Sequence, residues 1–177
     1  MRNVIETERL RLICCDELLI CTVLESDAAI TAMLHVEVAP EWNYGGAPAF
    51  QFSLKQITEH PDDEKWMTYV VVLKSENRLI GGGGYKGKPT AEGMVEIGYG
   101  IAESYRNRGF ATEMAMALTQ NAFNDSTVNM VMAHTLAEEN ASVKVLKRCG
   151  MKYAGEGYDP EDGKLWRWEI NRDDFNR

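Results

Sequence analysis

The feature that most constrains this chain is a short stretch, Arg106–Ala111, that lies between a strand-like and a helix-like segment. Residues 94–101 are rich in β-branched and aromatic residues, whereas residues 112–123 are almost wholly helix formers. The stretch therefore predicts a strand, a tight turn containing glycine, and a helix. The first amide groups of a helix have no intrahelical acceptor and lie at the positive end of its dipole. Such a turn predicts an anion site, usually for phosphate, and Arg106 and Arg108 strengthen that prediction.

Length and charge limit the classes of protein to which the chain can belong. The 177 residues suit one domain spanning residues 1–177, with 45% hydrophobic and 26% charged residues. A formal net charge of −8 argues against nucleic-acid or anionic-membrane partners, because phosphate surfaces need clustered Lys and Arg. It slightly favours a cationic substrate, although solubility alone also explains acidic proteins.

Neither a membrane span nor a signal peptide is expected. No apolar run approaches the roughly 18 residues needed to cross a bilayer. Residues 1–9 are charged and lack the apolar segment of a signal peptide. We therefore expect a cytoplasmic protein.

The cysteines and histidines form no metal-binding pattern. The sequence contains Cys14, Cys15, Cys21, Cys149, His35, His60 and His134. No two cysteines have Cys-x-x-Cys spacing, so we expect no metal and four reduced, partly buried thiols. A catalytic thiol is the less favoured alternative, because no motif supports it.

Hydrophobic periodicity and turn residues predict an alternation of strands and helices. Strands are expected at residues 7–15, 68–74, 78–86, 94–101, 130–135, 153–157 and 165–170. Helices are expected at residues 16–24, 27–38, 50–60, 112–123 and 140–149, with Asp16, Asp27 and Asn140 as N-caps. Short connections favour an antiparallel meander over residues 68–101. The fold class is therefore α/β or α+β with a mixed sheet.

Three motifs at the right distances carry a resemblance to a known family. They are Glu96–Tyr99 (EIGY), the R-x-x-G-x-A turn Arg106–Ala111, and residues 141–151 (ASVKVLKRCGM). Together they resemble the GNAT superfamily of acyl-CoA N-acyltransferases. The opening residues 7–12 (TERLRL) resemble its RimJ/RimL-like branch, whose members acetylate protein N-termini and small amines. The resemblance covers nearly the whole chain.

The resemblance implies a fold and a donor site. The fold would be a mixed, mostly antiparallel central sheet flanked by helices, with a splayed strand pair forming the acyl-CoA cleft. The CoA pyrophosphate would be wrapped by the amides of Asn107, Arg108, Gly109, Phe110, Ala111 and Thr112, with the basic side chain of Arg106 beside them. Tyr99, Gly100 and Ile101 would hydrogen-bond the pantetheine arm as an added strand does. An ordinary strand-to-helix connection is the alternative interpretation of the turn.

Acyl transfer to an amine needs a proton acceptor, and two residues are candidates. Glu96 lies mid-strand among apolar residues, where a carboxylate is unexpected; an exposed or arginine-paired glutamate is the alternative. His134 ends the strand that would border the cleft, and histidine is the side chain that ordinarily changes charge near neutrality. A packed histidine at the end of a strand is its alternative.

The helix at residues 140–149 departs from the commonest family pattern. Ser142 matches the motif serine and is a candidate for contact with the CoA sulfur, although a structural serine in the first turn is equally compatible. Many relatives carry a tyrosine as thiolate acid where this chain has Leu146. Many also carry an asparagine where this chain has Glu139, so Asn140, one residue later, is the CoA-binding candidate.

The acceptor is less constrained than the donor. Trp42 and Tyr44 lie in the loop where relatives build the acceptor pocket, with a solvent-facing loop anchor as the alternative. The glycine run 81–84 either exposes bare backbone to substrate or merely softens a strand. The resemblance implies an acetyl-CoA-dependent N-acetyltransferase in which a primary amine, from a protein N-terminus or a small molecule, attacks directly in a ternary complex. The alternative is a catalytically silent acyl-CoA-binding module. Homodimers are common among relatives, and no residue here decides that question.

Overall fold

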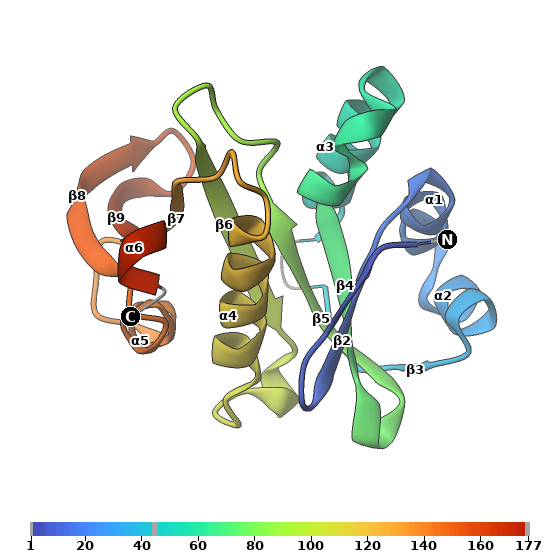
Figure 1. The fold of residues 1–177 in the computed structure, drawn as a ribbon. Helices are drawn as coiled ribbons and strands as arrows, with labels where there is room; N and C mark the ends of the chain where they lie inside the picture. Colours follow the sequence, from blue (N-terminus) through green and yellow to red (C-terminus); the bar gives the residue numbers. More distant parts are fainter. Residues whose placement is uncertain (1, 44–45, 176–177) are drawn as a thin grey trace.

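A computed structural model describes residues 2–43 and 46–175 of the chain. These residues form one mixed sheet in the order β1-β2-β4-β5-β6-β7-β9-β8, with β3 pairing to β5 (Figure 1). The strands are β1 (Val4–Glu6), β2 (Leu10–Cys14), β3 (Glu37–Val38), β4 (Thr68–Leu73), β5 (Arg78–Tyr85), β6 (Met94–Ile101), β7 (Met130–Leu136), β8 (Lys152–Asp159) and β9 (Gly163–Asn171). The expected antiparallel meander is confirmed as β4-β5-β6.

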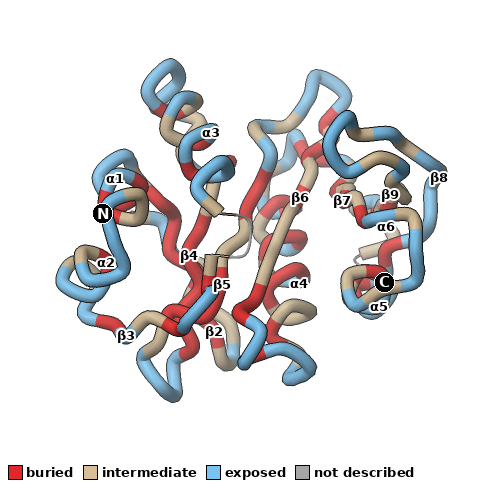
Figure 2. The backbone as a smooth tube through the Cα atoms, turned by 180° about the vertical axis from the view of Figure 1, so that it is seen from behind, coloured by how far each residue is buried: buried red, intermediate tan, exposed pale blue. Residues whose placement is uncertain are grey.

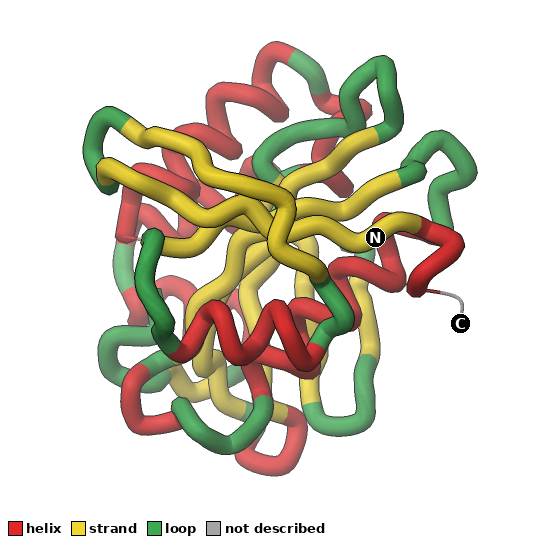
Figure 3. Tube along the Cα trace, turned by 90° about the vertical axis from the view of Figure 1, so that its left-hand side faces the viewer, coloured by secondary structure: helices red, strands yellow, loops and turns green. Residues whose placement is uncertain are grey.

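Helices lie on both faces of this sheet (Figure 3). They are α1 (Glu17–Glu25), α2 (Asp27–Leu34), α3 (Gly46–Glu59), α4 (Phe110–Phe123), α5 (Ala141–Arg148) and α6 (Arg172–Phe175), with short 3₁₀ turns at Pro61–Trp66, Lys74–Glu76 and Glu103–Tyr105. Alternate residues of a strand face opposite sides, so single contacts assign the helices to their faces. Tyr85 of β5 donates a hydrogen bond to the carbonyl of Leu118 in α4. On the other face, Ser53 of α3 and Thr68 of β4 share a hydrogen bond.

The core fills the space between the central strands and these helices. Buried residues follow the central strands, whereas β8 at the edge of the sheet is largely exposed (Figure 2). Tyr69, Tyr85 and Trp66 form edge-to-face aromatic contacts under the C-terminal half of α4. This mixed, mostly antiparallel sheet flanked by helices matches the expected fold class.

The sheet changes character between β6 and β7. These strands run parallel, and their pairing covers Met94–Met130, Val95–Val131 and Glu96–Met132. Both strands continue beyond Glu96 and Met132, but the described residues pair no further across this boundary. β7 instead pairs along its whole length with β9. The two halves of the sheet therefore part after Glu96.

Several expected boundaries at the N-terminal end were wrong. The strand expected at residues 7–15 is shorter, β2, and it pairs with an unexpected strand, β1. Residues 7–9 form the turn between them, because the Thr7 hydroxyl donates to the Leu10 carbonyl and accepts from the Leu10 amide. The helix expected at residues 27–38 ends at Leu34, because His35 adopts a left-handed conformation with φ of 55°. Ser26, not Asp27, supplies its N-cap oxygen. The third helix begins at Gly46 rather than Phe50.

Elsewhere the local expectations hold. The side chain of Asp16 caps α1 by accepting the Leu19 amide, and Asn140 caps α5 by accepting the Val143 amide. Gly150 follows α5 with φ of 80°, as expected of a helix C-terminus. β6 has the bounds that its sequence predicts.

Glu113 fastens the first turn of α4 to the β1–β2 hairpin. Its carboxylate accepts hydrogen bonds from the Thr7 hydroxyl at 2.6 Å, the Arg9 amide at 2.8 Å and the Arg9 guanidinium at 2.6 Å. Burial alone would raise the pKa of Glu113, but these hydrogen bonds outweigh it and lower the pKa. A carboxylate in the first turn also complements the helix dipole.

We predict that Glu113→Gln lowers the free energy of unfolding by about 1–3 kcal/mol at pH 7, because charged hydrogen bonds are lost. The folded pKa of Glu113 is depressed, so its contribution is present above the ordinary pKa of a glutamate and is lost as the pH falls. Urea unfolding at several pH values measures this. The gap between wild type and variant should narrow under acid conditions, whereas Glu59→Gln, at the exposed end of α3, should show no gap. A gap independent of pH would contradict the assignment.

Candidate functional site

The turn before α4 presents backbone amides rather than a capped helix end. Gly109 occupies the N-cap position with φ of 83° and supplies no side-chain acceptor to the first amides of α4. Asn107 is also left-handed, with φ of 61°. The first amides of the 14-residue helix have no intrahelical acceptor. The turn thus has the backbone geometry of an anion cradle, and the chemistry of the donor set suits a pyrophosphate.

Arg9, in the turn between β1 and β2, contacts the glycine turn and stabilises it. Its guanidinium donates to the carbonyl of Arg108 at 2.9 Å and lies 4.6 Å from the centroid of the Phe110 ring. A Cβ added at Gly109 would lie 3.3 Å from the Arg9 guanidinium. Arg106 donates to the carbonyl of Ile101 at the end of β6. Arg108 lies against the rings of Tyr105 and Phe110. Both arginines of the turn therefore make contacts within the protein that help to fix the shape of the turn.

An imidazole from β7 and an ammonium that follows β5 meet one carboxylate oxygen of β6 where β6 and β7 part. Glu96 of β6 contacts His134 of β7, with 3.0 Å between its Oε1 and Nδ1. The ammonium of Lys86, just after β5, lies 2.5 Å from the same Oε1. The Glu96 and His134 side chains are only 19% and 21% exposed. The structure therefore brings together both candidate proton acceptors and adds a lysine that the sequence analysis did not consider.

His134 lies across the sheet rather than pointing away from it. Its Nδ1 faces Glu96 on β6, and its Nε2 faces β8, where a Cβ added at Gly157 would be 3.7 Å away. A carboxylate at Nδ1 favours the tautomer that carries the proton on Nδ1 and leaves Nε2 as acceptor. The imidazole can thus receive a proton on the side away from the strand opening.

On the opposite face, the opening is lined by groups from β6 and α5. The hydroxyl of Tyr99 donates to the carbonyl of Ser142 at 3.4 Å. Burial raises the pKa of Tyr99, so its phenol stays protonated near neutrality. Leu146, at the position of the family tyrosine, is fully buried. The side-chain oxygen of Asn140 caps α5, which leaves its amide nitrogen as the group available to a ligand.

A cavity of about 230 Å³ lies on the α3 face of the sheet. Its floor is glycine backbone from β5 and β6, and its walls are aromatic. The lining includes Gly82, Gly83, Gly84, Gly98, Gly100, Trp42, Phe50, Tyr99 and Lys86. Trp42 is 3% exposed and donates to Asp27, so it is a buried wall and not a solvent-facing anchor. Tyr44 lies outside the described residues.

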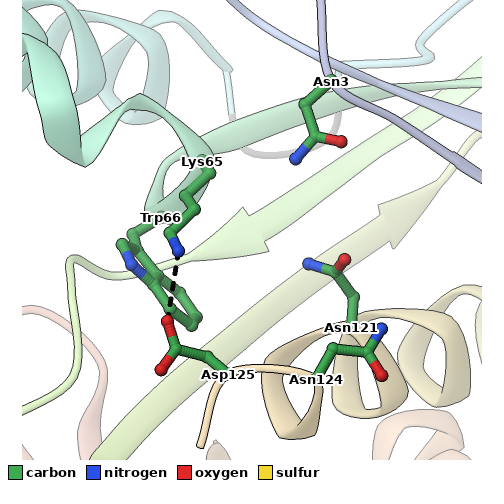
Figure 4. A pocket seen from close by; sticks show the side chains of 6 residues that line it. All are labelled: Asn3, Lys65, Trp66, Asn121, Asn124 and Asp125. Atoms are coloured by element: carbon green, nitrogen blue, oxygen red, sulfur yellow. Dashed lines mark hydrogen bonds and ion pairs between the residues drawn. The ribbon is translucent and has the colours of Figure 1, made fainter. Parts of the chain in front are cut away.

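A second cavity, of about 200 Å³, lies at the other end of α4 (Figure 4). Asn121 of α4 points toward Asn3, Asn124 follows the end of α4, and the Lys65–Asp125 ion pair of 3.1 Å lies on one side. It is open, polar and at the far end of α4 from the glycine turn. It therefore belongs to neither the cradle nor the glycine-floored cavity.

Three of the four cysteines are buried, but Cys21 of α1 is exposed, so the expectation that all four thiols are partly buried was wrong for Cys21, whose side of the helix faces solvent. Burial raises the pKa of the Cys149 thiol to about 11, and burial with nearby Glu64 raises that of Cys14 to about 12. Neither thiol is a ready nucleophile. No group of three potential metal ligands occurs among the described residues. Within the same residues, no helix combines the length and apolar character required to cross a bilayer.

Comparisons with known proteins agree with this architecture. A family model described as "Acetyltransferase (GNAT) domain" matches residues 18–152. The chain belongs to the GNAT acetyltransferase family. It is 28% identical over 147 residues to an uncharacterized N-acetyltransferase, YjdG, of Bacillus subtilis, covering 82% of this chain and 88% of that protein. The enzyme is therefore an N-acetyltransferase.

Solved structures share the fold over the whole length of the chain. A ribosomal-protein-S5-alanine acetyltransferase from Vibrio fischeri matches with a TM-score of 0.70 at 18% identity, covering 98% of both chains. RimL, a ribosomal L7/L12 α-N-protein acetyltransferase in complex with coenzyme A, matches with a TM-score of 0.69 at 15% identity, covering 97% of this chain and 99% of that one. At these identities the likeness establishes the fold.

The sequence analysis missed two contributors to the site. Lys86 reaches Glu96 only because Tyr85 pairs with Ile97, a register that the sequence does not reveal. Phe50 lines the cavity from a helix whose start was placed too late. The sequence does contain one signal for Lys86: in a strand, residues 82, 84 and 86 share a face, so two glycines would lie in line with this lysine.

We predict that Gly98→Leu fills the glycine-floored cavity without unfolding the enzyme. A Cβ at Gly98 would meet no atom within 4 Å, and its backbone is not left-handed. The added side chain should raise the KM for the acceptor amine at least several-fold while the melting temperature stays close to wild type. Initial-rate kinetics and thermal unfolding measure this. An unchanged KM would show that acceptors bind elsewhere.

Proposed function

We propose that this enzyme transfers the acetyl group of acetyl-CoA to a primary amine by direct attack within a ternary complex, and that it is most similar in function to the RimJ/RimL-like branch. The observation that carries the proposal is the parting of β6 and β7 directly beyond Glu96, with the amide turn at the far end of β6. A thioester lying in that opening, with its pyrophosphate on the turn, has its acetyl carbon beside Glu96 and His134.

The donor would run along the edge of β6 that β7 leaves free. On one edge of β6, β5 pairs with Tyr99, Gly100 and Ile101. On the edge of β6 that faces β7, no strand among the described residues pairs with these three. An extended pantetheine arm can take the place of a strand there. The amides of residues 107–112 would hold the pyrophosphate, and a strand amide would hydrogen-bond the oxyanion.

Proton removal would start at Glu96. An amine arrives as an ammonium and must lose a proton before its nitrogen can attack. The Glu96 carboxylate would accept that proton, and the Nδ1–H of His134, which donates to this carboxylate at 3.0 Å, would hold it in place. Nε2 faces β8, away from the reacting carbon, so His134 would act on Glu96 and not on the substrate.

The departing thiolate would be met by groups from the α4 and α5 face. Leu146 supplies no proton, but the protonated hydroxyl of Tyr99 lies at the first turn of α5, close to Ser142. Tyr99 would stabilise the thiolate, with the Ser142 hydroxyl as a second donor. This arrangement replaces the helix tyrosine that many relatives use.

The acceptor would occupy the glycine-floored cavity. Its aromatic walls and bare backbone suit a slender aliphatic or peptide amine, and the neighbouring Glu96 suits a cation. Protein N-termini and small-molecule amines both satisfy these requirements. A single domain over residues 1–177, a cytoplasmic location and a homodimer remain predictions.

Gly109→Trp should abolish acetyl-CoA binding in titration calorimetry while the enzyme stays folded by circular dichroism. The left-handed backbone at this position disfavours a side chain, and the indole would crowd the amides of the turn. Gly163→Trp is the matched control, because Gly163 is equally left-handed with φ of 78° but is the first residue of β9, where an added Cβ would meet no atom within 4 Å. Retained affinity in Gly109→Trp, or no binding by the wild type, would overturn the donor site.

Glu96→Gln should lower kcat about a hundredfold or more and leave acetyl-CoA affinity unchanged, because a general base is lost and no donor contact is. His134→Gln should lower kcat less, since it removes only the hydrogen-bond partner that positions the Glu96 carboxylate. Glu169→Gln serves as control: it is a part-buried carboxylate of β9, paired with Arg167, on the same sheet face. Acetyl transfer to an amine, followed by thiol release, is the measurement. An unimpaired Glu96→Gln enzyme would exclude this route.

A further inference from the structure

Lys86 places an ammonium where an acceptor would have to bind. It follows β5 directly, and its amide donates to the carbonyl of Glu96 at 2.9 Å, so the two residues are cross-strand neighbours. Residues 82, 84 and 86 share one strand face with Glu96 and Gly98. The Lys86 side chain therefore lies over the glycine floor of the cavity, and it is one of the residues that line it.

The Lys86 ammonium lies close to the point where β6 and β7 part. The Nζ atom lies 2.5 Å from Glu96 Oε1, the oxygen that also contacts His134. Glu96 belongs to the last residue pair before β6 and β7 part. The Lys86 nitrogen thus lies at the boundary between the acceptor cavity and the strand opening.

Lys86 is also free to move. Its side chain is 61% exposed and has a flexible four-carbon stem. Gly98, the next cavity residue on β6, leaves open space above its backbone. A shift of the ammonium from Glu96 into the opening needs no rearrangement of the sheet.

We infer that Lys86 is itself an acetyl acceptor, so that the enzyme acetylates its own Lys86 when acetyl-CoA is present without an amine. This inference rests on the proposed function, because it uses the same donor and the same proton acceptor. Lys86 is thus a modification site. The natural acceptor must displace the Lys86 side chain before it can react.

The step balances with acetyl-CoA as the only co-reactant. The Lys86 ammonium loses one proton to the Glu96 carboxylate, and the neutral nitrogen attacks the acetyl carbonyl carbon. A C–N bond forms and the C–S bond of the thioester breaks as the intermediate collapses and the nitrogen loses its second proton. CoA takes up one proton and leaves as the thiol, so one proton is released to solvent for each Nε-acetyl-lysine formed.

Lys88 supplies a matched control within the same segment. Its ammonium pairs with Asp63 at 2.9 Å, and its side chain is also 61% exposed. Chemical acetylation by a reactive thioester would modify both lysines to similar extents, because they are equally accessible. Only a reaction directed by Glu96 distinguishes them.

The test is mass spectrometry of the full-length enzyme incubated with acetyl-CoA and no amine, followed by peptide mapping. We expect the mass of one acetyl group on Lys86, matched by release of one equivalent of thiol, with acetylation of Lys88 at least about tenfold slower. Glu96→Gln should slow Lys86 acetylation about a hundredfold. Lys86→Arg should abolish both the added mass and the thiol release, and Lys88→Arg should preserve them.

The outcomes separate this inference from the proposed function. If the enzyme turns over added amines but Lys86 stays unmodified, or if Lys86 and Lys88 are acetylated equally, the inference is wrong and the proposed function stands. If calorimetry detects no acetyl-CoA binding, both fail. Acetylation of Lys86 that is unaffected by Glu96→Gln would also overturn the inference, because the reaction would not use the site.

Discussion

The structure depends on the point at which β6 and β7 stop pairing. A parallel pair in the middle of a sheet would ordinarily continue, because unpaired buried backbone groups cost free energy. Here β7 is held along its full length by β9, and β6 by β5, so each strand keeps one satisfied edge. The two free edges face each other beyond Glu96. The backbone groups on these two edges need hydrogen-bond partners, which a ligand bound like an extra strand can supply.

The interruption also joins two faces of the sheet that are otherwise separate. The glycine turn belongs to α4, and Tyr99 with Ser142 lies on the same face. The glycine-floored cavity lies on the face covered by α3. Because strand residues alternate in direction, Glu96 faces the cavity while Tyr99 faces the helices. A donor from one side and an acceptor from the other can meet only through the opening, next to Glu96.

Local signals predicted much of this arrangement, and registers explain what they missed. The bounds of β6, the caps of α1 and α5, and the turn before α4 follow from residues adjacent in sequence. The β1–β2 hairpin and the end of α2 do not, because a Thr7 hydrogen bond and a left-handed His35 decide them. Glu96 and His134 were recognised separately, but their contact depends on pairing between strands 38 residues apart. The part played by Lys86 depends on the β5–β6 register in the same way.

The contacts of Glu96 also bear on the charge of the acceptor. A carboxylate beside bare glycine backbone needs a counter-charge, and Lys86 supplies it. An ammonium that enters the cavity keeps the local charge balanced only if Lys86 moves to solvent, which its exposed stem permits. In the proposed function, the acceptor would bind by exchange of one cation for another, and an anionic ligand would gain nothing at Glu96. The proposed preference for a cationic amine would then arise from this one carboxylate, and the overall charge of −8 would add only a weak, salt-screened attraction.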